Sequence, residues 1–298
     1  MPPLPFGRLL TAMVTPFTAE GALDCEAAAR LATYLVDEQH NDGLVVNGTA
    51  GESPTTTDGE KADLLRAVVD AVGDRAQVIA GVGTFSTEHT LELSASAAKA
   101  GVDGVLVVTP YYSKPPQAGL LRHFRTVADA SDLPVMLYDI PHRAGVAIAT
   151  DTLLRLAEHP RIVAVKDAKT DLTASSAVMA GSDLAYYCGE DALTLPSLAV
   201  GAVGIVGTST HFSGTGTKEM IEAHVGGDVA RALELHRRLL PIFTGVFATQ
   251  GVILVKAGLA LQGRPVGGVR SPLVEATDAE RDALGRCLLA AGLPARAG

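Results

Sequence analysis

The chain has little of what marks exported or disulfide-stabilised proteins. It has 298 residues, no tryptophan, 4% aromatic residues and only three cysteines. Cys25, Cys188 and Cys287 lie far apart without a CxxC pair, and their number is odd. The segment Met1–Arg8 lacks the basic stretch, apolar core and cleavage site of a signal peptide. We therefore expect reduced thiols and a cytoplasmic protein.

The sequence also lacks the features of nucleic-acid-binding and membrane proteins. Its net charge of −9 argues against a general binder of phosphate backbones, which would carry a basic stripe. No run of about 18 apolar residues occurs, so no segment is expected to span a membrane. We therefore predict that neither nucleic acid nor a membrane is a partner.

Patterns that would hold a metal or a nucleotide are missing as well. The eight histidines are scattered, with no HxxxH or HExxH pair, and His142 and His211 lack partners at ligand spacing. Glu190 and Asp191 could bind Mg²⁺, but capping of the next helix explains them more simply. The segment Gly81–Ser86 fails GxGxxG at its last position, and no GxxxxGK[ST] occurs. We predict no metal and no other cofactor.

What the chain has instead is a regular alternation of two kinds of segment. Short apolar runs rich in Val, Ile and Gly are typical of parallel strands buried on both faces. Between them, segments such as Asp58–Val72 and Thr87–Ala100 carry apolar residues at helical spacing. The apolar runs are Leu9–Phe17, Gly43–Gly48, Gln77–Gly83, Gly104–Pro110, Pro134–Pro141, Ile162–Ala168, Leu184–Glu190 and Ala202–Thr208.

About eight strand–helix units without a break in composition predict an α/β protein, a (β/α)₈ TIM barrel over residues 1–225. Residues 226–298 carry helical patterns only and predict a C-terminal helical region packed on the barrel. The alternative is a doubly wound open sheet. It is disfavoured because Thr15–Phe17 stands where that fold carries a glycine fingerprint after its first strand.

Lys166 is the most informative single residue, because it ends an apolar strand. Strand alternation places Ile162, Ala164 and Lys166 on one face. In barrel enzymes the catalytic groups lie at the carboxyl ends of the strands. Desolvation there favours the neutral amine, which attacks carbonyl groups. The alternative is a lysine that extends from the strand end into solvent.

Other strand ends offer partners for such an amine. Tyr138 ends the preceding strand and could shuttle protons, or it could be a core tyrosine. Thr49 lies in a glycine-rich loop, where its hydroxyl could relay a proton or simply stabilise a turn. Arg143, in the loop after Tyr138, could clamp a carboxylate, although a lone loop arginine is more often a surface residue.

Four motifs at strand ends together resemble one enzyme family. They occur in order along the chain: Gly48–Ser53, Thr109–Tyr112, Leu137–Pro141 and Val165–Ala168. The set resembles the dihydrodipicolinate synthase / N-acetylneuraminate lyase family, and within it the actinobacterial synthases. The similarity covers essentially the whole length.

The resemblance implies a lyase that condenses pyruvate with L-aspartate 4-semialdehyde to give 4-hydroxy-tetrahydrodipicolinate, in diaminopimelate and lysine biosynthesis. By resemblance, Lys166 forms the imine with pyruvate, so no separate cofactor is needed. Tyr138 is the proton donor and acceptor, and Thr49 connects it to Tyr112, which reaches in from a neighbouring subunit. Arg143 receives the carboxylate of the aldehyde substrate, which favours a synthase over the sialic-acid lyases.

The resemblance also assigns the wall that binds the smaller substrate. The backbone near Ala50 and Val206 holds the pyruvate carboxylate and flanks the imine, and Gly189 belongs to the same substrate-binding set. The partners implied are small molecules and further copies of the chain, because members of the family are commonly homotetramers built from tight dimers.

Some positions depart from the family pattern. Ala50 stands where synthases usually carry a second threonine, His142 and Ala144 flank the arginine, and Gly207 replaces a common serine. These positions lie at the mouth and affect the second substrate rather than the imine. A related pyruvate-dependent aldolase or lyase acting on a different aldehyde is therefore the alternative function.

The regulatory site of lysine-inhibited relatives is altered too. Phe85, His89, Asp58 and Lys61 stand where those relatives carry amide, acidic and histidine residues. This difference predicts weak or absent inhibition by lysine.

Two other classes of function remain open. A catalytically silent sensor of a keto acid or of a protein partner would be expected to lose Lys166 or Tyr138, and both are present. A phosphate-binding barrel would need a glycine-rich loop after its last strands. Ser213–Gly216 is a weak version of that loop, and a flexible lead into the last barrel helix explains it more simply.

Overall fold

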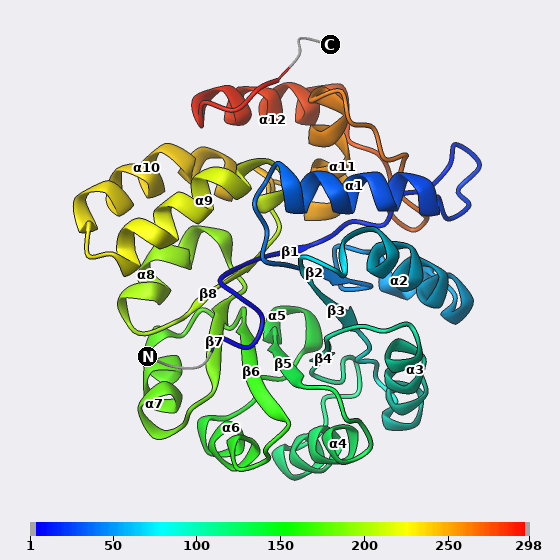
Figure 1. Ribbon diagram of the computed structural model, residues 1–298, viewed down its shortest axis with the longest axis vertical. Coiled ribbons are helices and arrows are strands. Elements are labelled where there is room, and N and C mark those ends of the chain that lie inside the picture. The colour runs from blue at the N-terminus through cyan, green and yellow to red at the C-terminus, as the bar shows by residue number, and fades with distance from the viewer. Residues whose placement is uncertain (1–3, 296–298) are drawn as a thin grey trace.

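Eight parallel strands form a closed barrel in which each strand pairs with the next and β8 returns to β1 (Figure 1). The structure is a computed structural model that describes residues 4–295. The predicted (β/α)₈ fold is confirmed. The strands are β1 (Leu9–Ala12), β2 (Gly43–Val46), β3 (Gln77–Gly81), β4 (Gly104–Val108), β5 (Val135–Asp139), β6 (Ile162–Asp167), β7 (Ala185–Cys188) and β8 (Gly204–Gly207).

Each predicted apolar run contains one strand but continues past its carboxyl end. Met13, Val14, Val82 and Ile140 follow their strands and are all buried. The N–H groups of Met13 and Val82 still donate to carbonyl oxygens of the neighbouring strands, whereas the Val14 N–H donates to the His211 side chain. Hydrophobicity alone therefore does not mark where a strand ends. Burial and strand pairing are separate properties here.

Helices surround the barrel and follow the strands in turn (Figure 1). Side chains cap several of these helices: Thr57 and Glu60 form a reciprocal capping box at α2, and the Ser86 side chain caps α3. The helices of the barrel are α1 (Cys25–Asp37), α2 (Asp58–Val72), α3 (Thr87–Lys99), α4 (Gln117–Asp129), α5 (Pro141–Ala144), α6 (Thr150–Ala157), α7 (Leu172–Gly181), α8 (Thr194–Ala199) and α9 (Thr210–Val225).

Ser213–Gly216 lies inside α9, so its interpretation as a flexible lead was wrong. The Ser213 hydroxyl donates to the Ser209 carbonyl one turn earlier, which satisfies a polar group that otherwise favours loops. Gly214 faces α1's end, where an added Cβ would lie 2.4 Å from the Gln39 carbonyl oxygen. Close packing, rather than flexibility, explains this glycine.

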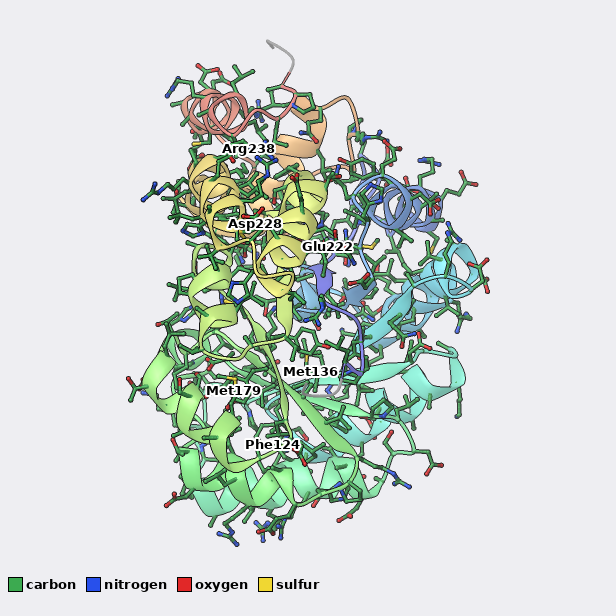
Figure 2. The ribbon with its side chains drawn as sticks, turned by 60° about the vertical axis from the view of Figure 1, so that its left-hand side comes forward. Phe124, Met136, Met179, Glu222, Asp228 and Arg238 are labelled. Carbon is green, nitrogen blue, oxygen red and sulfur yellow. The ribbon has the colours of Figure 1, made fainter. Side chains whose placement is uncertain are left out.

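Three further helices follow the barrel: α10 (Val229–Gly245), α11 (Gly251–Leu261) and α12 (Asp278–Ala290). They lie together at one side of the barrel beside α9, and Asp228 caps α10 (Figures 1 and 2). Their apolar residues join the same core as the barrel residues Phe124 and Met136. The division into regions 1–225 and 226–298 stays a prediction. Residues 1–3 and 296–298, at the two ends of these regions, lie outside the described residues.

Within the part of the chain that the structure describes, no helix is long and apolar enough to cross a bilayer.

The barrel closes where β8 meets β1, and Gly204 makes this contact possible. The Ile205 N–H donates to the Arg8 carbonyl oxygen at 2.8 Å. A Cβ on Gly204 would lie 2.0 Å from that same oxygen. Only glycine fits there without separating the two strands.

We expect G204A to lower the free energy of unfolding by about 1–3 kcal/mol, because the added methyl group overpacks the closing strand pair. Urea denaturation measures the change. G59A is the matched control, since its Cβ would meet nothing closer than Thr57 Oγ1 at 3.9 Å. G59A should be neutral or up to about 1 kcal/mol stabilising. Equal midpoints for the two variants would contradict this account of closure.

Candidate active site

The carboxyl ends of β2, β5, β6 and β7 converge on one pocket at the mouth of the barrel, with a volume of about 270 Å³. The structure brings six of the predicted site residues into its lining, from different strands and loops. They are Thr49, Ala50, Tyr138, Arg143, Lys166 and Gly189.

Lys166 lies on β6 in register with Tyr138 on β5, and its side chain is only 5% exposed. Its Nζ lies 4.3 Å from the centre of the Tyr138 ring. Burial lowers the pKa of Lys166 to about 8; nearby Asp191 opposes this shift, and the charge of Arg143 adds to it. An amine with this pKa is partly neutral near pH 7 and can act as a nucleophile.

Tyr138 is also buried, on the strand next to Lys166. Burial raises the pKa of its phenol to about 12, while Arg143 and a hydrogen bond with Thr49 act in the opposite direction. The phenol therefore keeps its proton at neutral pH. A protonated phenol beside a nucleophilic amine can donate its proton to the hydroxyl group that leaves when the amine forms an imine.

The loop after β2 carries Thr49 and Ala50 and is held tightly. The Thr15 hydroxyl donates to the Gly51 carbonyl oxygen at 2.6 Å, and the Gly51 N–H donates to the Gly48 carbonyl oxygen at 3.1 Å. The Asn47 side chain donates to the Lys61 carbonyl oxygen at 3.1 Å and so connects the loop to α2. These bonds hold the backbone at the pocket wall in one conformation.

Arg143 reaches the pocket from α5, the short helix after β5. Beneath that segment, the Asp139 carboxylate accepts from the Ile148 N–H at 3.2 Å and lies 3.3 Å from Lys169 Nζ. Burial raises the pKa of Asp139 to about 6, against the effect of Lys169. The sequence analysis missed this pair, because Lys169 follows the strand in a loop and nothing local indicates where it turns.

Asp191 was interpreted as a helix cap, and this was wrong. Its side chain makes no capping bond to the turn that it begins. It accepts instead from the N–H groups of Thr208 and Ser209, at 3.1 and 2.7 Å, and from the Ser209 hydroxyl at 2.5 Å. It thereby joins the loop after β7 to the loop after β8, and its charge acts on the pKa of Lys166.

The described residues contain no group of three or more His, Cys, Asp or Glu side chains placed to hold a metal ion.

The C-terminal region supplies one side of the pocket, which the sequence analysis did not expect. The connection between α10 and α11 contributes Phe247, Thr249 and Gln250 to the lining, and the start of α11 contributes Val252. The Gln250 side chain also caps α11 by accepting from the Val252 N–H at 2.8 Å. No strand precedes this connection, so the rule that places chemistry at strand ends could not find it.

Two predicted residues lie apart from the pocket. Tyr112 is 93% exposed, has a positive φ of 72°, and lines an adjoining pocket of about 380 Å³ together with Thr49, Tyr138 and Arg143. Val206 is fully buried in β8, where it pairs with β1. It is not part of the pocket lining, whereas Thr208 is.

Comparisons with known proteins agree on one family. The sequence model of the dihydrodipicolinate synthetase family matches residues 5–291. The chain is 68% identical to a 4-hydroxy-tetrahydrodipicolinate synthase of Acidothermus cellulolyticus over 97% of this chain and 94% of that one. It is 60% identical to 4-hydroxy-tetrahydrodipicolinate synthase 2 of Streptomyces coelicolor, over 98% and 97%.

Among solved structures, the dihydrodipicolinate synthase of Cyanidioschyzon merolae with lysine bound superposes with a TM-score of 0.95. It is 42% identical and the match covers 97% of this chain and 99% of that one. The family model spans nearly the whole chain, and the curated relatives match over nearly their full lengths. The chain therefore belongs to the dihydrodipicolinate synthetase family.

Proposed function

We propose that this chain is a class I lyase that condenses pyruvate with L-aspartate 4-semialdehyde to give 4-hydroxy-tetrahydrodipicolinate, a step toward diaminopimelate and lysine. The activity for which relatives that are 60–68% identical are named supports it. The observation that carries the proposal is the buried Lys166 amine, 4.3 Å from the ring of Tyr138 in a pocket at the barrel mouth.

In the proposed reaction, the neutral Lys166 amine attacks C2 of pyruvate. The carbinolamine hydroxyl takes a proton from the Tyr138 phenol and leaves as water, which forms the imine. Loss of a proton from C3 then gives an enamine, and this carbon attacks the aldehyde carbon of the second substrate. The amino group of the second substrate then attacks C2 and displaces the Lys166 amine, which closes the ring and releases the product. The covalent imine takes the place of a cofactor.

The mouth provides separate places for the two substrates. The backbone near Ala50, with Gly189, binds pyruvate, and the Arg143 guanidinium binds the carboxylate of the semialdehyde. Ala50 lacks the hydroxyl of a threonine, and a hydrogen bond to a charged group contributes about 1.5–3 kcal/mol. Hydrogen bonds from backbone N–H groups therefore contribute a larger share of the binding of the pyruvate carboxylate in this chain.

The working form that we propose is a cytoplasmic homotetramer built from tight dimers. Tyr112 supports it: a tyrosine that is 93% exposed in one chain has a positive φ and lies beside Thr49 in the adjoining pocket. In the dimer, Thr49 would connect Tyr138 to Tyr112 of the neighbouring subunit.

Turnover and trapping test the reaction. We expect borohydride with pyruvate to add a three-carbon unit at Lys166, seen by peptide mass, and K166A to remove both the adduct and at least about 10³-fold of kcat, because the nucleophile is lost. A coupled assay with aspartate semialdehyde follows product formation. Adduct without turnover would instead favour the alternative, a pyruvate-dependent aldolase for another aldehyde, and absence of the adduct would contradict both.

The pH dependence of imine formation should report the Lys166 amine. The pKa is lowered to about 8, so the neutral fraction, and with it the trapping rate, should rise with pH through about 8 and then level off. Trapping rates at a series of pH values measure this. A rise that continues to about pH 10, the range of an ordinary lysine, would show that burial does not tune the group.

We also expect weak or absent inhibition by lysine. Asp58 already lies 2.9 Å from His89 Nε2 and 3.9 Å from Lys61 Nζ, so two basic side chains of the chain compete with the ammonium of a ligand for its carboxylate. Initial rates with and without millimolar lysine measure the effect. Strong inhibition at that concentration would prove this expectation wrong.

A further inference from the structure

Glu52 ends the loop that carries Thr49 and Ala50, and it is almost completely buried. Its backbone has a positive φ of 55°, and its N–H donates to the Thr49 carbonyl oxygen at 3.2 Å. Its side chain is 1% exposed, although a buried carboxylate is costly unless it is paired. The partners of this carboxylate come from far along the chain.

The first partner is Lys256 on α11. Its Nζ donates to Glu52 Oε1 at 2.7 Å and to the Gly268 carbonyl oxygen at 2.6 Å. The Lys256 side chain is 4% exposed, so both charges of the pair are removed from water. Its ammonium also lies 4.2 Å from the centre of the Phe17 ring, in the loop after β1.

The second partner is Arg270, in the connection between α11 and α12. Its backbone N–H donates to Glu52 Oε2 at 2.8 Å. Its guanidinium donates to the Thr55 carbonyl oxygen at 2.9 Å and pairs with Glu60 at the start of α2. It also lies 4.2 Å from the Phe17 ring centre. The C-terminal region therefore holds the loop between β2 and α2 at its middle, through Glu52, and at its α2 end, through Thr55 and Glu60.

We infer that the pair Glu52–Lys256 is a positioning device, through which the C-terminal helices align the Thr49–Ala50 loop with Tyr138 and Lys166. The inference rests on the proposed function, because it assigns the loop its role in proton transfer and pyruvate binding. Glu52 and Lys256 themselves do not line the pocket at Lys166. They act on the reaction through the backbone of residues 49–52.

The same helix joins the pair to the pocket directly. Gln250 and Val252, at the start of α11, are part of the lining, and Lys256 follows in the next turn. A shift of α11 would therefore move both the pocket wall and the anchor of the loop. Misplacement of a positioned group by about 1 Å can cost about 10²-fold in rate.

A double-mutant cycle between Lys256 and Thr49 tests the inference. We expect K256M to lower kcat about 10- to 100-fold. If Lys256 acts through Thr49, then T49V/K256M should be no slower than T49V alone, within about twofold. Losses that multiply in the double variant would mean a general structural role and would overturn the inference. If K256M does not fold, E52Q enters the same cycle, since it removes the charge and keeps an acceptor for Arg270.

K218M is the matched control. Lys218 pairs with Asp42, which is partly buried before β2, at the opposite end of the barrel. K218M breaks an ion pair without touching the loop, so its kcat should stay within about twofold of the wild type. In T49V/K218M, the small loss of kcat from K218M should multiply with the loss from T49V.

Hydrogen exchange separates this inference from the proposed function. The N–H groups of Gly51 and Glu52 are bonded to the Gly48 and Thr49 carbonyls, and they should lose protection in K256M but not in K218M. Unchanged protection in K256M would overturn the inference whatever the activity. Loss of protection in a protein that does not turn over pyruvate and aspartate semialdehyde would leave the positioning role standing and refute the function alone.

Discussion

Closure of the parallel ladder between β8 and β1 is the constraint on which the active-site geometry depends. Eight short strands, each with unpaired backbone groups at its edges, satisfy one another only as a ring. Because the strands run parallel, the ring collects all their carboxyl ends at one mouth. Lys166 and Tyr138, on neighbouring strands, then face a common pocket without any further device.

Around that pocket, the buried carboxylates are paired, whereas the buried amine is not. The carboxylates of Glu52, Asp139 and Asp191 each have a partner, either a lysine or a set of N–H and hydroxyl donors. Lys166 forms no ion pair with any of the described residues, and the charge of Asp191 offsets the effect of burial only in part, so the pKa of Lys166 falls. Rigid, paired charges hold the loops, and the unpaired amine is left reactive.

Much of the fold could be predicted from the sequence, and so could the centre of the site. Strand alternation marked Lys166, and short apolar runs marked every strand, because both depend on neighbours close in the chain. The strand ends were placed too late, since residues such as Val14 and Ile140 are buried although they lie beyond the strands. Asp191 was misinterpreted because its donors, Thr208 and Ser209, come from the next unit of the barrel.

The sequence by itself determined the barrel and indicated Lys166 and the surrounding loops as the candidate site, because these follow from local patterns repeated along the chain. Only the tertiary structure decided which distant side chains complete the site. Lys256 meets Glu52 across about two hundred residues of sequence, and the wall at Gln250 comes from a region without strands. Such pairings depend on how helices pack on the closed barrel, and no local spacing encodes that packing.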